Sequence, residues 1–330
     1  MSNSKVGHNK NPEISTDSTV LAIVVPCLNE ELVIDSTADR LIGLLDKLKS
    51  RGKIDQQSYL YFVDDGSEDQ TWSKIVDLHG KNGQIKGLKL ASNVGHQNAL
   101  MAGLLKIRKR IDCVVSIDAD LQDDISVIET FVDYYCQGYD VVYGVRNQRR
   151  ADSLFKKYTA KTFYKLLKVM GVSIVDNHAD FRLASRRVIE SLKEYREVNL
   201  FLRGIFPLLG FRSTSVLYDR SERVAGESKY TVRKMLSLAW NGITSFSVAP
   251  LRLITVVGLA TFVFAGLIGI WVLKAYFRGE VVPGWSSLLL TVAALGGIQL
   301  FCIGLIGEYI GKIYKEVKAR PRFIVEQELS

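Results

Sequence analysis

Short apolar segments alternate with amphipathic ones through the first two thirds of the chain. The apolar segments are rich in β-branched and aromatic residues, which predicts buried strands. Five such segments occur, at 20–26, 59–65, 85–91, 113–120 and 139–145. Between the first two, apolar residues recur at helical spacing from Leu32 to Leu48, and further helices are predicted from Ala99 and near Ile128. Strand–helix–strand repetition predicts an α/β fold with a mostly parallel sheet and helices on both faces.

Two long runs without charge occupy the C-terminal part of the chain, at 253–273 and 285–307. At 1.5 Å per residue they reach about 31 and 34 Å, enough to cross the hydrocarbon core of a bilayer. Two buried core helices are the alternative. Arg252 precedes the first run, and five basic residues follow the second between positions 312 and 322. This bias predicts two transmembrane helices, at 251–276 and 284–311, with both termini cytoplasmic.

The remaining segments complete the expected organisation. Residues 1–18 are polar and lack an apolar core, so they predict a disordered tail and not a signal peptide. Residues 19–230 are expected to form a soluble, cytoplasmic domain. Residues 231–250 mix apolar and basic positions, as an amphipathic interfacial helix would, and 154–169 have the same character. For each of these two, a helix packed on the domain core is the alternative. Residues 312–330 are expected to be a basic cytoplasmic tail.

Composition adds one constraint. The chain carries 43 Lys and Arg against 35 Asp and Glu, a net charge of +8, which suits an anionic partner such as nucleic acid, phospholipid or a nucleotide without choosing among them. The four cysteines have no C-x-x-C spacing, which predicts reduced thiols and neither a disulfide framework nor a zinc site.

Polar residues follow each of the five predicted strands. They are Asn29-Glu30-Glu31, Asp64-Asp65-Gly66-Ser67, Ser92-Asn93, Asp118-Ala119-Asp120 and Arg146. In parallel sheets ligands bind beyond the carboxyl ends of the strands, so these residues are expected to share one site.

The acidic stretch 118–124 is the strongest candidate for chemistry. Asp118 and Asp120 would share a face of an extended segment, which suits a divalent cation, although such pairs also occur on solvated loops. Carboxylate oxygens favour Mg²⁺ or Mn²⁺, and Mg²⁺ usually takes further ligands from substrate phosphates, so a diphosphate and hence a nucleotide is indicated. Asp123 and Asp124 are expected to cap a helix that begins near Ile125. Neither a P-loop nor a dinucleotide fingerprint is present.

Six motifs in order resemble the family 2 glycosyltransferases of the GT-A fold. They are P-C-L-N-E-E (26–31), V-D-D-G-S-x-D-x-T (63–71), N-x-G-x-x-x-A (93–99), D-A-D-L-Q-D (118–123), D-F-R-L (180–183) and G-x-S-K-Y (226–230). The resemblance is to the branch that loads a sugar onto a polyprenyl phosphate, which includes dolichyl-phosphate mannose synthases. The C-terminal part looks most like bacterial undecaprenyl-phosphate glucosyltransferases of O-antigen glucosylation.

The resemblance implies roles for individual residues. The nucleoside would be held by Pro26, Leu28, Asn29, Glu30 and Asp65. The metal and the diphosphate would be held by Asp118, Asp120 and Gln122, with Asp120 as the direct ligand and Asp118 nearer the ribose and a metal-bound water. Other contacts to the nucleotide sugar are expected from Asn93, Ala119 and Arg146, and contacts to the acceptor phosphate from Arg203, Arg223 and Lys229.

Asp180 is the second residue expected in catalysis beside Asp120. Family members place a general base near this position, and a turn or a salt bridge with Arg182 is the alternative. A lipid phosphate is already largely dianionic at neutral pH, which favours an orienting carboxylate that positions Arg182. His96 is expected to begin a helix near the nucleotide.

The reaction implied is an inverting transfer of a hexose, with UDP-glucose favoured as donor, to undecaprenyl phosphate at the cytoplasmic face of the inner (plasma) membrane. Mannose, N-acetylglucosamine or an aminoarabinose derivative are alternative sugars. A membrane-tethered nucleotide-sugar-binding protein without turnover and a phosphohydrolase that uses Asp118 are alternatives of other classes. The expected cofactor is Mg²⁺ or Mn²⁺. The expected partners are the nucleotide sugar, the polyprenyl phosphate and the membrane, with no nucleic acid. Glycines between 296 and 311 leave a homo-oligomer possible.

Overall fold

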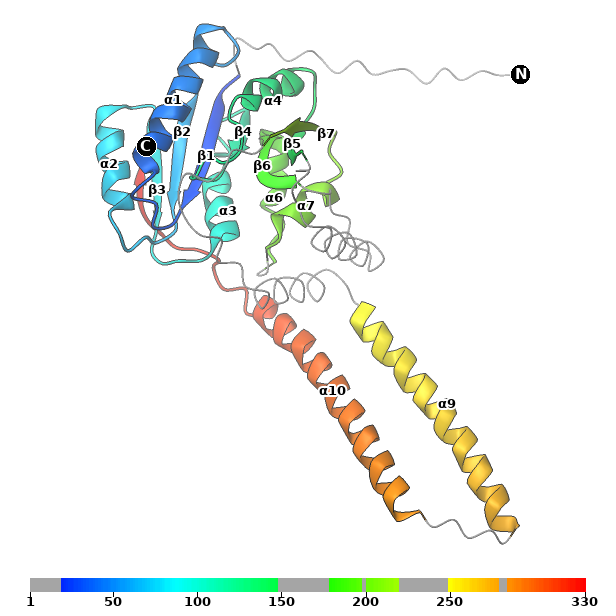
Figure 1. Ribbon diagram of the computed structural model, residues 1–330. Coiled ribbons are helices and arrows are strands. Elements are labelled where there is room, and N and C mark those ends of the chain that lie inside the picture. Colours follow the sequence, from blue (N-terminus) through cyan, green and yellow to red (C-terminus); the bar gives the residue numbers. More distant parts are fainter. Residues whose placement is uncertain (1–18, 148–177, 198–199, 220–248, 279–283) are drawn as a thin grey trace, which may run out of the picture. The chain divides into compact units, whose positions relative to one another are not determined.

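The structure is a computed structural model that describes residues 19–147, 178–197, 200–219, 249–278 and 284–330 (Figure 1). The chain forms two compact units, an α/β unit that includes residues 321–330 and a second unit that contains the long C-terminal helices. The predicted amphipathic segment at 154–169 and all but the last two positions of the one at 231–250 lie outside the described residues, as do Arg223 and Lys229.

The elements of the α/β unit follow the predicted alternation. The strands are β1 (Leu21–Cys27), β2 (Tyr59–Asp64), β3 (Ile85–Leu90), β4 (Cys113–Ser116), β5 (Val141–Arg146), β6 (His178–Ser185), β7 (Ser213–Tyr218) and β8 (Val325–Leu329). The helices are α1 (Ile34–Ser50), α2 (Thr71–Lys81), α3 (His96–Ile107), α4 (Val127–Cys136), α6 (Arg186–Leu192) and α7 (Leu202–Leu208). The five strands predicted from apolar runs are therefore confirmed, although the fourth ends at Ser116 and not at Asp120.

One sheet of order β7-β5-β6-β4-β1-β2-β3-β8 contains all these strands. The central strands β4, β1, β2 and β3 are parallel, and β7 is parallel to β5. β6 enters between β4 and β5 and is antiparallel to both, and β8 is antiparallel to β3. The sheet is thus mostly parallel, as predicted, and β1 lies near its centre with all seven residues buried.

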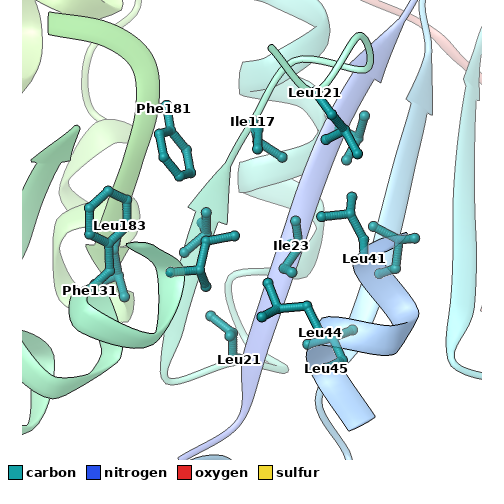
Figure 2. Packing of buried hydrophobic residues seen from close by; sticks show 14 of the residues in the cluster. Leu21, Ile23, Leu41, Leu44, Leu45, Ile117, Leu121, Phe131, Phe181 and Leu183 are labelled. Atoms are coloured by element: carbon teal, nitrogen blue, oxygen red, sulfur yellow. The ribbon is translucent and has the colours of Figure 1, made fainter. Parts of the chain in front are cut away.

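Alternate residues of β1 supply two cores, one on each face of the sheet. Leu21, Ile23 and Val25 pack with residues of α1 and α4 in one cluster (Figure 2). Ala22 and Val24 point the other way and pack with α3, α6 and α7. Burial on both faces explains why this strand reads as a continuous apolar run.

A glycine sets how closely α3 approaches the sheet. A Cβ at Gly103 would lie 2.6 Å from Cγ2 of Val63 and 3.0 Å from Cγ1 of Val24, so no larger residue fits without a shift of the helix or the strands. This close packing fixes α3 against β1 and β2. The first turn of α3, which starts at His96, follows the loop at the carboxyl end of β3.

The second unit contains two long helices, α9 (Ala249–Phe277) and α10 (Trp285–Val317). The two charge-free runs lie within them, so their helical conformation is confirmed. Among the described residues, one stretch, Pro250–Ile268 in α9, is long and apolar enough to cross a membrane.

The chain does not end in a simple basic tail. Residues 325–329 form β8 at the edge of the sheet, where Gln327 accepts a hydrogen bond from Trp72 Nε1 at 3.2 Å and Glu326 pairs with Lys89 at 3.0 Å. Glu328 pairs with Lys106 of α3 at 2.8 Å. An edge strand with exposed N–H and C=O groups invites unwanted pairing, and β8 covers that edge of β3.

Deletion of residues 321–330 should therefore destabilise the α/β unit although it leaves the predicted site residues in place. Loss of the β3 pairing and of the apolar contacts of Leu329 should cost about 2–3 kcal/mol of unfolding free energy, or about 5–10 °C in Tm. Thermal unfolding of the detergent-solubilised full chain measures this. Glu326→Gln, which removes only an exposed ion pair, is the matched control and should change Tm by little. An unchanged Tm after the deletion would show that β8 is dispensable.

Candidate functional site

The loops after β1 and β2 hold each other through backbone groups. Asn29 N donates to Ser67 Oγ at 3.0 Å, and Glu68 N donates to Asn29 Oδ1 at 2.9 Å. Glu30 N donates to Thr71 Oγ1 at 2.8 Å. Asn29 has a φ of 54°, a conformation that asparagine tolerates better than most residues. Leu28 and Asn29 are exposed at this edge, whereas Pro26 is buried inside β1 beneath them.

Asp65 ties the loop after β2 to the loop after β3. Its two carboxylate oxygens accept hydrogen bonds from Val94 N at 2.8 Å and Gly95 N at 3.0 Å. Gly66 lies at φ +69°, and a Cβ there would be 2.6 Å from the carbonyl carbon of Ser92, so only glycine allows this approach. Asp65 is 2 % exposed, and its predicted contact with the nucleoside remains a prediction.

The acidic motif forms a turn and not the extended segment expected from the sequence. β4 ends at Ser116, and Leu121 N donates to Asp118 O at 3.3 Å. Leu121 has a φ of 41°, and its buried side chain belongs to the same core cluster as Leu41 (Figure 2). The expectation that Asp118 and Asp120 share a strand face was therefore wrong. The turn instead leaves Asp120 exposed and Asp118 half-exposed.

The backbone of this turn is anchored from α1. Thr37 Oγ1 donates to Ala119 O at 2.7 Å, and Ala119 itself is buried. Gln122 is also buried, and its backbone N donates to Asp120 Oδ1 at 3.4 Å. The turn is thus held by a buried leucine, a buried alanine carbonyl and the motif's own backbone.

Asp123 and Asp124 do not cap a helix as expected. α4 begins at Val127, and Ser126 at its N-cap makes no side-chain cap. Asp124 Oδ1 accepts from Ser126 N at 2.9 Å. Asp123 is buried and binds Arg146, which lies at the end of β5, with Nε to Oδ1 at 3.1 Å.

Asp180 is the most highly connected acid of the site. It lies inside β6 and not in a turn, and Arg182 Nη2 donates to its Oδ1 at 2.6 Å. Arg203 Nη2 donates to Oδ2 at 3.0 Å, and Gln97 Nε2 donates to the same oxygen at 3.3 Å. Nε2 of His96 is 3.6 Å from Asp180 Oδ2 and also 3.6 Å from Asp118 Oδ1, so this histidine links Asp180 to the acidic turn.

The charges around these acids shift their pKa values in opposite directions. Burial on its own raises the pKa of Asp180, but His96, Arg182 and Arg203 outweigh it and hold this pKa well below its usual range. Desolvation and repulsion from nearby carboxylates raise the pKa of Asp118, although His96 opposes them. Asp180 is therefore ionised and accepts hydrogen bonds from several side chains. Asp118 has too little positive charge around it to bring its pKa down to the ordinary value.

Arg182 is not a group that Asp180 could present to a substrate. Its side chain is 1 % exposed, its guanidinium carbon lies 4.3 Å from the ring centre of Phe206, and its Nη1 is 3.5 Å from Leu202 O. The predicted pairing with Asp180 is confirmed, but its predicted purpose was wrong. Arg203, with a side chain 42 % exposed, is the arginine partner of Asp180 that faces solvent.

The acidic turn provides only part of the ligand set that a divalent cation needs. Within the part of the chain that the structure describes, no group of three or more His, Cys, Asp or Glu is arranged to hold a metal ion. Asp118 and Asp120 offer oxygen ligands, and a Mg²⁺ or Mn²⁺ held by them would need its other ligands from water and substrate phosphate. This donor set suits a cation that arrives with a diphosphate.

The structure brings most of the predicted residues to one edge, and it adds some that the sequence did not single out. Asn93 is exposed there, with its Oδ1 accepting from Gly95 N at 3.0 Å. Gln97 and Tyr218 were missed, because neither belongs to a run of polar residues at a strand end. The N-x-G-x-x-x-A motif contains Gln97, and this was the available signal. His96 begins α3, as predicted.

Comparisons with known proteins identify a family and several similar chains. Residues 22–193 match glycosyl transferase family 2, and residues 249–313 match the GtrB C-terminal hairpin. An uncharacterized glycosyltransferase of Bacillus subtilis, YkoT, is 51 % identical over 94 % of this chain and 92 % of its own length. The bactoprenol glucosyl transferase of Shigella phage SfV is 40 % identical over 93 % of this chain and 98 % of its own.

A solved structure is similar at lower identity. Glucosyl-3-phosphoglycerate synthase from Mycobacterium tuberculosis, in complex with Mn²⁺, UDP and glucosyl-3-phosphoglycerate, aligns with a TM-score of 0.44 and 18 % identity, over 68 % of this chain and 78 % of that one.

Asp180→Asn should destabilise the α/β unit strongly, because it leaves Arg182 as a buried charge without its counter-charge. Removal of one partner of a buried ion pair costs about 3–5 kcal/mol. Chemical denaturation of the full chain in detergent measures this loss. Asp133→Asn, which breaks a partly exposed pair with Lys53, is the control and should cost less than about 1 kcal/mol. Equal losses in the two variants would contradict a special role for the Asp180 pair.

Proposed function

Since the chain belongs to glycosyltransferase family 2, we propose that it transfers glucose from UDP-glucose to undecaprenyl phosphate at the cytoplasmic face of the plasma membrane. The observation that carries the proposal is the extent of the similarity. Relatives named as bactoprenol glucosyl transferases match at about 40 % identity over 93 % of the chain, through both the α/β unit and the C-terminal hairpin. The binding roles below rest on this proposal.

The donor would bind over the acidic turn. Asp120 and Asp118 project from a turn that the core holds in place, so their oxygens are positioned before any ligand binds. A divalent cation bound there would neutralise charge on the departing nucleoside diphosphate. Leu28 and Asn29, which are exposed on the neighbouring loop, are proposed to contact the nucleoside.

The acceptor is proposed to need orientation more than deprotonation. The second pKa of a phosphate monoester is near 6, so the attacking oxygen is largely ionised at neutral pH. Asp180 is a poor base, because the groups around it lower its pKa well below the ordinary value although burial raises it. Its strongest effect on the surface is to hold the guanidinium of Arg203 in a fixed orientation. We assign Arg203 to the acceptor phosphate, with Asp180 as its positioning residue.

The two long helices α9 and α10 are proposed to anchor the protein in the membrane that contains its lipid substrate. The apolar stretch Pro250–Ile268 is long enough to cross a membrane, and α10 contains a second charge-free run of similar length. Basic residues precede the first apolar run and follow the second, at the two ends where the helix pair continues in the sequence toward the α/β unit. This distribution favours a cytoplasmic location for that unit.

The test is to supply membranes containing the protein with a panel of labelled nucleotide sugars and undecaprenyl phosphate, and to identify the lipid product by mass spectrometry. UDP-glucose should give a glucosyl phospholipid. Chelation of divalent cations should stop the transfer, and Mg²⁺ or Mn²⁺ should restore it. A product that carries mannose, N-acetylglucosamine or aminoarabinose would replace the proposed sugar, and release of free sugar or phosphate without a lipid product would contradict lipid transfer.

Asp120→Asn should lower transfer on the order of 10²-fold or more, because it removes a negative ligand from the proposed cation site. Since Asp120 is exposed, the variant should keep the Tm of the wild type. Asp124→Asn is the matched control in the same motif, because within the described part of the chain its side chain makes only the local contact to Ser126 N. Its rate should stay close to that of the wild type. Near-normal transfer by Asp120→Asn at saturating cation would contradict the metal assignment.

A further inference from the structure

Asp123 has no assigned role in the reaction, yet it is among the most buried acids of the site edge. Its side chain is 3 % exposed. Tyr218 donates its hydroxyl to Oδ1 at 2.7 Å, and Arg146 donates Nε to Oδ1 at 3.1 Å and Nη2 to Oδ2 at 3.4 Å. Arg146 Nε is also 3.3 Å from the Tyr218 hydroxyl, so the three side chains form a closed triangle.

The tyrosine of this triangle is fixed by its own surroundings. Tyr218 ends β7 and lies in register with Arg146, which ends the parallel strand β5. Its ring packs edge-on against Phe181, with centroids 5.4 Å apart and planes at 88°. Asn147 N donates to the backbone oxygen of Tyr218 at 2.8 Å, which joins the two strand ends beyond the ladder. These contacts fix the position of the Tyr218 hydroxyl independently of its hydrogen bond with Arg146.

The arginine is held by only one edge of its guanidinium. Nε and Nη2 face Asp123, and among the residues that the structure describes only Asp123 and Tyr218 accept hydrogen bonds from Arg146. The side chain is 31 % exposed. A guanidinium is a planar fork, so when one edge is fixed the orientation of the remaining N–H groups is fixed too. Those groups are suited to phosphate oxygens.

We propose that Asp123 and Tyr218 are positioning residues that orient Arg146 beside the acidic turn, so that its free N–H groups bind a phosphate oxygen of a substrate. Asp123 lies three positions after Asp120 in the same loop, so the triangle also ties that turn to β5 and β7. The inference rests on the proposed function for the presence of a phosphate ligand. The phosphate belongs to the donor diphosphate or to the lipid acceptor, and the chemistry of recognition is the same for both.

A purely structural role for the triangle predicts a different outcome from a positioning role. Removal of one partner of a buried ion pair leaves an uncompensated charge, which would lower Tm whatever Arg146 binds. A positioning role requires in addition that a substitution of Asp123 or Tyr218 changes the kinetics only when Arg146 is present. The two are separated by a double-mutant cycle, which isolates the coupling between two side chains.

The experiment uses the full-length protein in detergent or nanodiscs and compares Tyr218→Phe, Arg146→Lys and the double variant. Tyr218→Phe keeps the ring on Phe181 and the ion pair, and removes only the hydroxyl. It should lower kcat/KM about 10-fold, the equivalent of one charge-assisted hydrogen bond, mainly through KM. In the Arg146→Lys background the same substitution should have no further effect on kcat/KM, because the oriented guanidinium is already gone.

Asp123→Asn should act in the same direction as Tyr218→Phe and more strongly. Two controls remove comparable buried interactions away from this edge. Tyr135→Phe removes a buried hydroxyl that donates to Asp112 O at 3.4 Å, and Asp140→Asn breaks the pair of Asp140 with Arg187. The controls should lower Tm at most and leave both KM values unchanged.

The two KM values identify the ligand. A rise in the KM for UDP-glucose alone assigns Arg146 to the donor diphosphate, and a rise for undecaprenyl phosphate alone assigns it to the acceptor; both results support the inference. Losses of kcat/KM that add in the double variant, or unchanged KM values in Tyr218→Phe and Asp123→Asn, overturn it. If the wild type transfers no sugar, the proposed function fails, and the inference is then tested by the Kd values of UDP and of undecaprenyl phosphate in the same variants.

Discussion

The site depends on keeping a charged carboxylate inside the protein. Asp180 lies within an interior strand of the sheet, where an isolated carboxylate would take up a proton or unfold the strand around it. It remains ionised because Arg182, Arg203 and His96 lower its pKa against the effect of burial, which raises it. The requirement for these partners is met by residues from α3, β6 and α7, which meet at one point.

The arrangement has a consequence for the acidic turn. His96 lies 3.6 Å from both Asp118 and Asp180, so the turn is connected to the buried network through one imidazole. The pKa of Asp118 is still raised, first by desolvation and then by the neighbouring acids, because one histidine does not balance the carboxylates around it. A bound cation would supply the missing positive charge. Among the acids of 118–124, Asp123 is thus paired with Arg146, and Asp118 and Asp120 are the two that we propose bind a cation.

The strands that could be predicted from the sequence are those marked by a continuous run of apolar residues. β1, β2 and β4 are buried on both faces and read as apolar runs. β6 was missed because Asp180 and Arg182 interrupt the apolar pattern in its middle, and β8 because its sequence VEQEL is mostly acidic and polar. Residue types at the strand ends predicted that these side chains lie together at one edge of the sheet. The partners could not be read from a single sequence, since the Asp123–Tyr218 hydrogen bond joins residues 95 positions apart.

Two aspartate–arginine pairs with similar burial adjoin the acidic turn, one through His96 and one through the loop that contains Asp123. Asp180 holds Arg203 and Asp123 holds Arg146, and in each pair the acid is nearly buried while the guanidinium keeps 42 % or 31 % of its side chain exposed. Buried ion pairs contribute little net stability, which is consistent with the proposal that these two orient their arginines. In the proposed reaction a donor diphosphate and a lipid phosphate would repel each other, and a site that joined them would need fixed positive charge near both. Guanidinium groups oriented in advance provide that charge without the entropy cost of ordering flexible side chains during binding.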